Sequence, residues 1–141
     1  MTLAREADFV VPLAVANVET ENLVGDALFS AMKPTAWLIN ASRGNLVDEA
    51  ALERALDARR IAGAALDVGR AADQKPSLRL AQRPDVIATP HIGGLTPPSL
   101  KHQALETVRQ TDAILRGEIP VGSVNAEHAT RLARLKAGGV A

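Results

Sequence analysis

The sequence predicts an α/β fold in which parallel strands alternate with helices. Four short apolar runs without strict alternation recur along the chain, and segments with helical spacing of apolar residues separate them. The chain has 141 residues, of which 47% are apolar, so one ordinary domain buries a real core. Strands and helices that alternate in this way form parallel βαβ units, with helices on the faces of the sheet.

The four apolar runs are the predicted strands: Asp8–Val15, Thr35–Asn40, Ile61–Asp67 and Asp85–Thr89. The first run is apolar at successive positions, which is typical of a strand covered on both faces. Pro12 has no N–H to donate to a neighbouring strand, so we expect it near the end or the edge of that strand.

Three segments predict helices: Gly25–Lys33, Asp48–Arg60 and Pro97–Leu115. We expect Asp26 and Asp48 to cap the first two, because a carboxylate accepts hydrogen bonds from the free N–H groups of a first turn. Residues 69–84 are polar without a clear period, which indicates a long connection. Arg116 and Gly117 are typical of a helix end, so the third helix is expected to stop there.

Composition excludes several classes of function. Sixteen basic and sixteen acidic residues balance without a basic stripe, which argues against nucleic acid or an anionic membrane as partner. The chain lacks cysteine, which excludes a disulfide framework and a thiolate site and fits a cytoplasmic protein. No apolar run approaches the roughly 18 residues of a membrane span. No pair of His or carboxylate residues has metal-ligand spacing, so we expect no metal.

A polar side chain follows three of the predicted strands. Arg43, Asp67 and His91 come after the second, third and fourth strands, where ligands bind in open parallel sheets. An arginine pairs with a carboxylate, and a histidine passes a proton near neutral pH. Together they suit an oxidoreductase acting on a small carboxylate-bearing alcohol or ketone. Singly, each also fits a structural role as a surface ion pair, a cap or a turn residue.

Three blocks of sequence carry a resemblance to a known family. They are Met32–Glu49 (MKPTAWLINASRGNLVDE), Ile61–Val68 (IAGAALDV) and Val86–Gly94 (VIATPHIGG). In this order, the blocks resemble the signature of the D-isomer-specific 2-hydroxyacid dehydrogenases, and Val121–Asn125 resembles the closing segment of that family. The resemblance implies a partial Rossmann-like parallel sheet with flanking helices and a long C-terminal helix.

The resemblance also implies roles for individual residues. Arg43 matches the arginine that binds the 2-oxo acid, and His91 matches the acid/base that protonates the carbonyl oxygen or removes that proton in reverse. Asp67 matches the residue that holds the nicotinamide carboxamide of NAD or NADP. The positions that line the cofactor in relatives correspond to Ala41, Ser42, Arg43, Asp67, His91, Gly93 and Gly94.

The sequence departs from the family pattern in two places. The glutamate that usually pairs with the histidine is replaced by Ala72, and Asp73, one residue later, is the candidate substitute. None of the ten glycines forms G-x-G-x-x-G, the turn that binds a dinucleotide pyrophosphate. We therefore interpret residues 1–117 as the C-terminal half of a dinucleotide-binding domain, and residues 118–141 as a tail that in relatives returns to the substrate domain.

Two functions follow as hypotheses. The first is hydride transfer between NAD(P) and a 2-oxo or 2-hydroxy acid, with the isolated fragment expected to be inactive. The second is a non-catalytic relative that acts as a dimerisation or binding module. The expected partners are a small 2-oxo or 2-hydroxy acid and either a second copy of the chain or the N-terminal half that carries the glycine turn.

Overall fold

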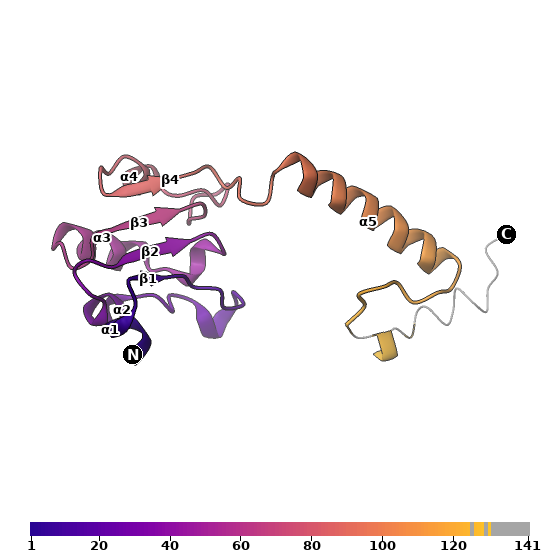
Figure 1. Cartoon of the computed structure of the whole chain (residues 1–141), viewed down its shortest axis with the longest axis horizontal. Helices are drawn as coiled ribbons and strands as arrows, with labels where there is room; N and C mark the ends of the chain where they lie inside the picture. Colours follow the sequence, from indigo (N-terminus) through magenta and orange to yellow (C-terminus); the bar gives the residue numbers. More distant parts are fainter. Residues whose placement is uncertain (125, 129, 131–141) are drawn as a thin grey trace. The chain divides into compact units, whose positions relative to one another are not determined.

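The computed structural model describes residues 1–124, 126–128 and 130. The chain divides into two compact units, Met1–Gly93 and Gly94–Ala141 (Figure 1). The first unit ends before the long helix, whereas the predicted domain boundary follows that helix at Gly117. The assignment of residues 1–117 and 118–141 to family domains stays a prediction, and residues 125, 129 and 131–141 of the tail lie outside the described residues.

The first unit is built on a four-stranded parallel sheet in the order β1-β2-β3-β4 (Figure 1). The strands are β1 (Phe9–Val10), β2 (Trp37–Asn40), β3 (Gly63–Leu66) and β4 (Val86–Ala88). Asn40 is level with Leu66, and Leu66 is level with Ala88. The predicted parallel sheet is confirmed, and the carboxyl ends of its last three strands lie in register.

One helix precedes the first strand, and three others lie in the connections between successive strands. They are α1 (Thr2–Glu6), α2 (Asp26–Ala31), α3 (Glu49–Asp57) and α4 (Leu78–Ala81), with 3-10 turns at Val18–Thr20 and Gly44–Leu46. Asp48 caps α3 as predicted, because its carboxylate accepts from the Ala51 N–H at 3.0 Å. The cap of α2 was predicted wrongly: Gly25 holds that position, and Asp26 is already helical.

The core lies on one face of the sheet. Leu38 of β2, Ala64 of β3 and Val86 of β4 form one row and are buried against Phe29 of α2 and Leu52 of α3. Along β1 the burial alternates instead, and Phe9 stays 63% exposed. The prediction that this strand is covered on both faces is therefore wrong for the described unit, in which helices cover one face.

Two other segments differ from their predicted extent. The first strand pairs over only two residues, because Pro12 follows closely and offers no N–H to β2, so the expected position of this proline is confirmed. The connection 69–84 contains α4, whose single turn is too short to show a helical period. Leu80 of α4 is fully buried, so packing, rather than intrinsic propensity, explains this turn.

The second unit consists mainly of α5 (Pro97–Leu115). The Thr96 side chain accepts from the Ser99 N–H, and prolines occupy the first turn, where they cost no hydrogen bond. The helix ends at Arg116 and Gly117 as predicted, with the glycine at φ 72. No residue of α5 is buried in the described structure, and no helix of the described residues is long and apolar enough to cross a bilayer.

A close contact between two glycines joins the carboxyl ends of β2 and β3. A Cβ added to Gly44 would lie 2.1 Å from the Gly69 carbonyl oxygen, and a Cβ on Gly69 would lie 2.5 Å from the Lys75 carbonyl oxygen. Both glycines are buried. Because backbone atoms on both sides cannot rotate away, only glycine fits at this crossing.

We predict that Gly44→Ala lowers the free energy of unfolding by about 1–3 kcal/mol, since overpacking moves the backbone after β3. Chemical denaturation measures the change. Gly94→Ala is the matched control, because its added Cβ meets no atom within 4 Å and should leave stability nearly unchanged. Equal stability of the two variants would contradict the close crossing.

Candidate active site

The predicted site residues follow three neighbouring strands. Arg43 lies three residues beyond the end of β2, Asp67 directly follows β3, and His91 lies three residues beyond β4. The register of these strands places all three residues at the same edge of the sheet, with Asp67 on the middle strand. This is the edge at which open parallel sheets bind ligands.

Asn40 shapes the turn that carries Arg43. Its side chain is 1% exposed, its Nδ2 donates to the Arg43 carbonyl at 3.0 Å, and its Oδ1 accepts from the Ser42 N–H at 3.1 Å. A buried side-chain amide whose N–H donates and whose oxygen accepts fixes the backbone around it, because breaking either hydrogen bond leaves a buried polar group unpaired. The turn Ala41–Arg43 is therefore held in place from inside the sheet.

Arg43 itself is exposed and lines an open cavity of about 370 Å³. Its Nη1 donates to the Ser42 carbonyl at 2.7 Å, which steadies one arm of the guanidinium. The other residues around the cavity are Gly44, Asn45, Val68, Gly69, Arg70, Ala71 and Gln74. The cavity is thus formed by the segments that follow β2 and β3.

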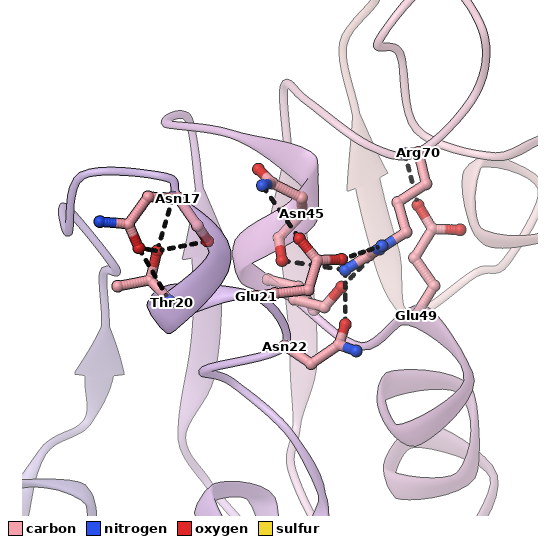
Figure 2. A network of polar contacts seen from close by, with 8 residues as sticks. Asn17, Thr20, Glu21, Asn22, Asn45, Glu49 and Arg70 are labelled. Carbon is pink, nitrogen blue, oxygen red and sulfur yellow. Dashed lines mark hydrogen bonds and ion pairs between the residues drawn. The ribbon is translucent and has the colours of Figure 1, made fainter.

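Arg70 ties together the segments that follow the first three strands (Figure 2). Its guanidinium donates to Glu21 at 2.7 Å and to Asn22 Oδ1 at 2.5 Å. It also donates to the backbone carbonyls of Asn45 and Val47, at 2.9 and 3.0 Å. A planar guanidinium has five N–H donors and can bind several acceptors at once, whereas the charge of a lysine ammonium is concentrated at one atom.

The same network perturbs an acidic group. Hydrogen bonds from Arg70 and then Asn45 lower the pKa of Glu21, and they outweigh the opposing effect of desolvation. Glu49 completes the connection, since its side chain accepts from the Arg70 N–H at 2.9 Å. The wall of the cavity beside Arg43 is therefore fixed by one arginine and its acceptors.

Asp67 accepts three hydrogen bonds from the segment that follows β4. Its Oδ1 accepts from the Thr89 hydroxyl at 2.5 Å and the Ile92 N–H at 2.9 Å, and its Oδ2 accepts from the Gly93 N–H at 2.9 Å. Partial burial raises the pKa of Asp67, but these bonds and the nearby charge of His91 outweigh it and lower the pKa. The structure thus brings Asp67 and His91 together.

Asp73 is engaged elsewhere. Its carboxylate forms an ion pair with Lys75 Nζ at 2.8 Å and accepts from the Lys75 N–H, and both effects lower the pKa of Asp73. No hydrogen bond or ion pair between Asp73 and His91 occurs among the described residues. In this structure the loop pairs Asp73 with Lys75. The pairing of Asp73 with His91 therefore stays a prediction.

We compared the sequence and the fold of this chain with those of known proteins. The profile of "D-isomer specific 2-hydroxyacid dehydrogenase, NAD binding domain" matches residues 1–93, about two thirds of the chain. The chain belongs to this family. The predicted resemblance and the Rossmann-like fold class are confirmed, and the domain is the family's NAD-binding domain.

Individual family members match over most of this chain but only part of their own length. Similar proteins include D-3-phosphoglycerate dehydrogenase 2 of Arabidopsis thaliana, 41% identical over 85% of this chain and 19% of that protein. Glyoxylate reductase of Thermofilum pendens is 37% identical over 89% of this chain and 37% of that protein. The D-lactate dehydrogenase of Lactobacillus jensenii with NAD+ superposes with a TM-score of 0.77 at 36% identity, covering 85% of this chain and 40% of that one.

Sequence reasoning about this family domain missed three positioning groups. Asn40 and Thr89 lie inside the matched blocks but carry no recognisable motif of their own, since their roles depend on partners brought close by the turns. Arg70 lies in the polar connection, where an arginine looks like an ordinary surface residue. The one sequence signal for any of these roles is an Asn at the end of an apolar strand, which could have indicated the positioning role of Asn40.

We predict that Asn40→Ala destabilises the domain by about 1–3 kcal/mol, because it leaves the Arg43 carbonyl and the Ser42 N–H without their partner. Thermal unfolding followed by circular dichroism measures the loss. Gln82→Ala removes an exposed amide and serves as the control, with an expected change of under about 0.5 kcal/mol. A loss of stability as small as in that control would contradict the role of Asn40.

Removal of the Arg70 guanidinium in Arg70→Met is expected to raise the pKa of Glu21 toward its ordinary value of 4.5. Because the folded-state pKa is lowered, the pair stabilises the fold above that ordinary value and loses its effect as pH falls through the lowered value. Carbon-13 NMR of the Glu21 carboxyl follows the titration. An unchanged midpoint would contradict the network, and Arg109→Met, which removes an arginine on α5, is the control.

Proposed function

We propose that this chain supplies the nicotinamide-side half of an enzyme that transfers hydride between NAD(P) and a 2-oxo or 2-hydroxy acid. One observation supports this proposal most strongly. Arg43, Asp67 and His91 follow the carboxyl ends of three neighbouring parallel strands, at the same edge of the sheet. A carboxylate binder, a cofactor-orienting acid and a proton carrier at one sheet edge form the set that such a reaction needs.

Arg43 binds the substrate in this proposal. Its exposed guanidinium faces the cavity beside Gly69 and Gln74, and one arm is held by the Ser42 carbonyl. The remaining N–H groups form a fork that matches the carboxylate of a 2-oxo acid, and they polarise the adjacent carbonyl group. The Asn40 bonds hold the backbone that carries Arg43, and the Arg70 bonds hold the cavity wall beside it, so less freedom is lost when substrate binds.

His91 carries the proton. In reduction, the protonated imidazole donates to the carbonyl oxygen while C2 gains a hydride, so the product is the 2-hydroxy acid and the imidazole becomes neutral. In oxidation, the neutral imidazole removes the hydroxyl proton.

The residues present fit the nicotinamide end of the cofactor, which supplies or accepts the hydride when bound. Asp67 Oδ2 accepts only the Gly93 N–H among the described residues, so one lone pair is left for a carboxamide N–H. A Cβ on Gly93 would lie 2.9 Å from that oxygen, so a side chain there would crowd this oxygen. Ala41, Ser42 and Gly94 remain proposed as lining residues.

The pyrophosphate end has no such fit, because the sequence contains no G-x-G-x-x-G turn. We therefore propose that the isolated chain does not turn over substrate and that a polypeptide carrying the glycine turn completes the site. The exposed edge strand β1 and the uncovered face of the sheet, with Phe9 63% and Ile87 62% exposed, support such a partner. A homodimer and a cytoplasmic location remain part of the proposal.

A second candidate is a non-catalytic binding module derived from the same family. Ala72 at the position of the family's glutamate favours this candidate, as does the pairing of Asp73 with Lys75. Without a carboxylate from that loop, His91 lacks the usual orienting group, and such a loss costs orders of magnitude in rate. The two candidate functions differ in one testable respect, namely whether the site turns over substrate once a polypeptide with the glycine turn completes it.

The deciding experiment completes the site. Residues 1–117 replace the matching segment of the Thermofilum pendens glyoxylate reductase, and oxidation of NADH and NADPH is followed with glyoxylate, pyruvate and hydroxypyruvate. We expect turnover by the chimaera and none by the isolated chain. His91→Ala should lower kcat by at least about 100-fold, and Arg43→Gln should mainly raise KM.

The control is His102→Ala, which removes an exposed histidine of α5 and should leave kcat and KM within about twofold. A folded chimaera without activity would reject the catalytic proposal and favour the binding module. Full activity in His91→Ala would also reject the assigned proton carrier.

A further inference from the structure

The segment Thr89–Gly93, here called the His91 loop, is attached to a single carboxylate at three points. Asp67 accepts from the Thr89 hydroxyl before His91, and from the Ile92 and Gly93 N–H groups after it. The histidine is therefore bracketed by hydrogen bonds to one side chain. Thr89 is fixed in turn, because its N–H donates to the Leu66 carbonyl of β3 at 2.9 Å.

His91 adopts a backbone conformation that needs such support. Its φ is 58, in the left-handed region that costs a side-chain-bearing residue free energy. Its N–H donates to the Thr89 carbonyl at 3.0 Å, which closes a tight turn. Residues held in this region persist where the surroundings over-determine them, and such strain is common where a site depends on one orientation.

We propose that Asp67 and Thr89 are positioning residues for His91, acting as a clamp that holds the His91 loop and so aims the imidazole at the reacting oxygen. This proposal rests on the proposed function and adds to it. Asp67 then has two tasks, because the lone pair left on Oδ2 is available to a carboxamide N–H while the other bonds hold the loop. Thr89 has no task in the proposed reaction other than the clamp.

The clamp explains how His91 is oriented when the position of the family's glutamate is Ala72. Asp73 is paired with Lys75, so the loop after β3 brings no carboxylate to the histidine. Asp67 instead places its charge beside His91 and fixes the backbone on both sides of it. In the described part of the chain, His91 is the one titratable group whose charge acts on the Asp67 carboxylate.

The clamp also has a defined pH dependence. Its hydrogen bonds lower the pKa of Asp67, so its stabilising effect is complete above the ordinary value of 3.8 and is lost as pH falls through the lowered value. Protonation of Asp67 converts one carboxyl oxygen into an O–H donor and leaves the other as a neutral, weaker acceptor. The Ile92 and Gly93 amides are therefore expected to respond together as this carboxyl titrates.

The test uses nuclear magnetic resonance on the full chain, without substrate or cofactor. Thr89→Val keeps the branched shape but removes the hydroxyl, Thr89→Ser restores the hydroxyl, and Asp73→Asn is the matched control. We expect Thr89→Val to raise the pKa of Asp67, read from its carboxyl carbon, and to speed exchange of the Ile92 amide by about fivefold. Thr89→Ser and Asp73→Asn should keep the wild-type values.

Equal titration and exchange in Thr89→Val and the wild type would overturn the clamp, and so would a shift of the same size in Asp73→Asn. A second readout uses the active chimaera, in which Thr89→Val should lower kcat about tenfold or more while KM stays within twofold, since misplacement of His91 affects proton transfer. Unchanged kcat there would overturn the positioning role. An inactive chimaera rejects the proposed function alone, because the measurements on the free chain do not depend on it.

Discussion

The parallel pairing of β2, β3 and β4 is the constraint on which the rest of the structure depends. The strands are only three or four residues long, yet their register brings Asn40, Leu66 and Ala88 level with one another. The polar segments that follow these three strands therefore begin side by side at one edge of the sheet. The bonds from Asp67 to the segment after β4, and from Arg70 to the carbonyls of Asn45 and Val47, join segments that this register has already brought within reach.

Much of this fold was predictable, because apolar runs and helix spacing report burial directly. The strands, α3 with its Asp48 cap, and α5 followed from pattern alone. What the sequence did not show depends on tertiary contacts. Leu80 makes α4 a helix through burial, Gly25 replaces Asp26 as cap through backbone geometry, and Phe9 is exposed because no helix of the described unit covers its face.

The candidate site divides in the same way. Arg43, Asp67 and His91 were identified from their places after strands and from a family resemblance. Their supports were not, because a hydrogen bond such as Thr89 to Asp67 joins residues 22 positions apart and has no local signature. Residue type predicts which groups carry the chemistry, whereas their orientation is decided by neighbours that only the folded chain brings together.

Arg70 has a consequence for protein engineering. It binds acceptors on three separate segments, namely Glu21 and Asn22 after β1, the carbonyls at 45 and 47 after β2, and Glu49 at the start of α3. The loop that follows β3 is thus not an independent module. A designer who transplants this loop into another member of the family must carry Glu21, Asn22 and Glu49 with it, because the first two accept from the Arg70 guanidinium and the third accepts from the Arg70 backbone N–H.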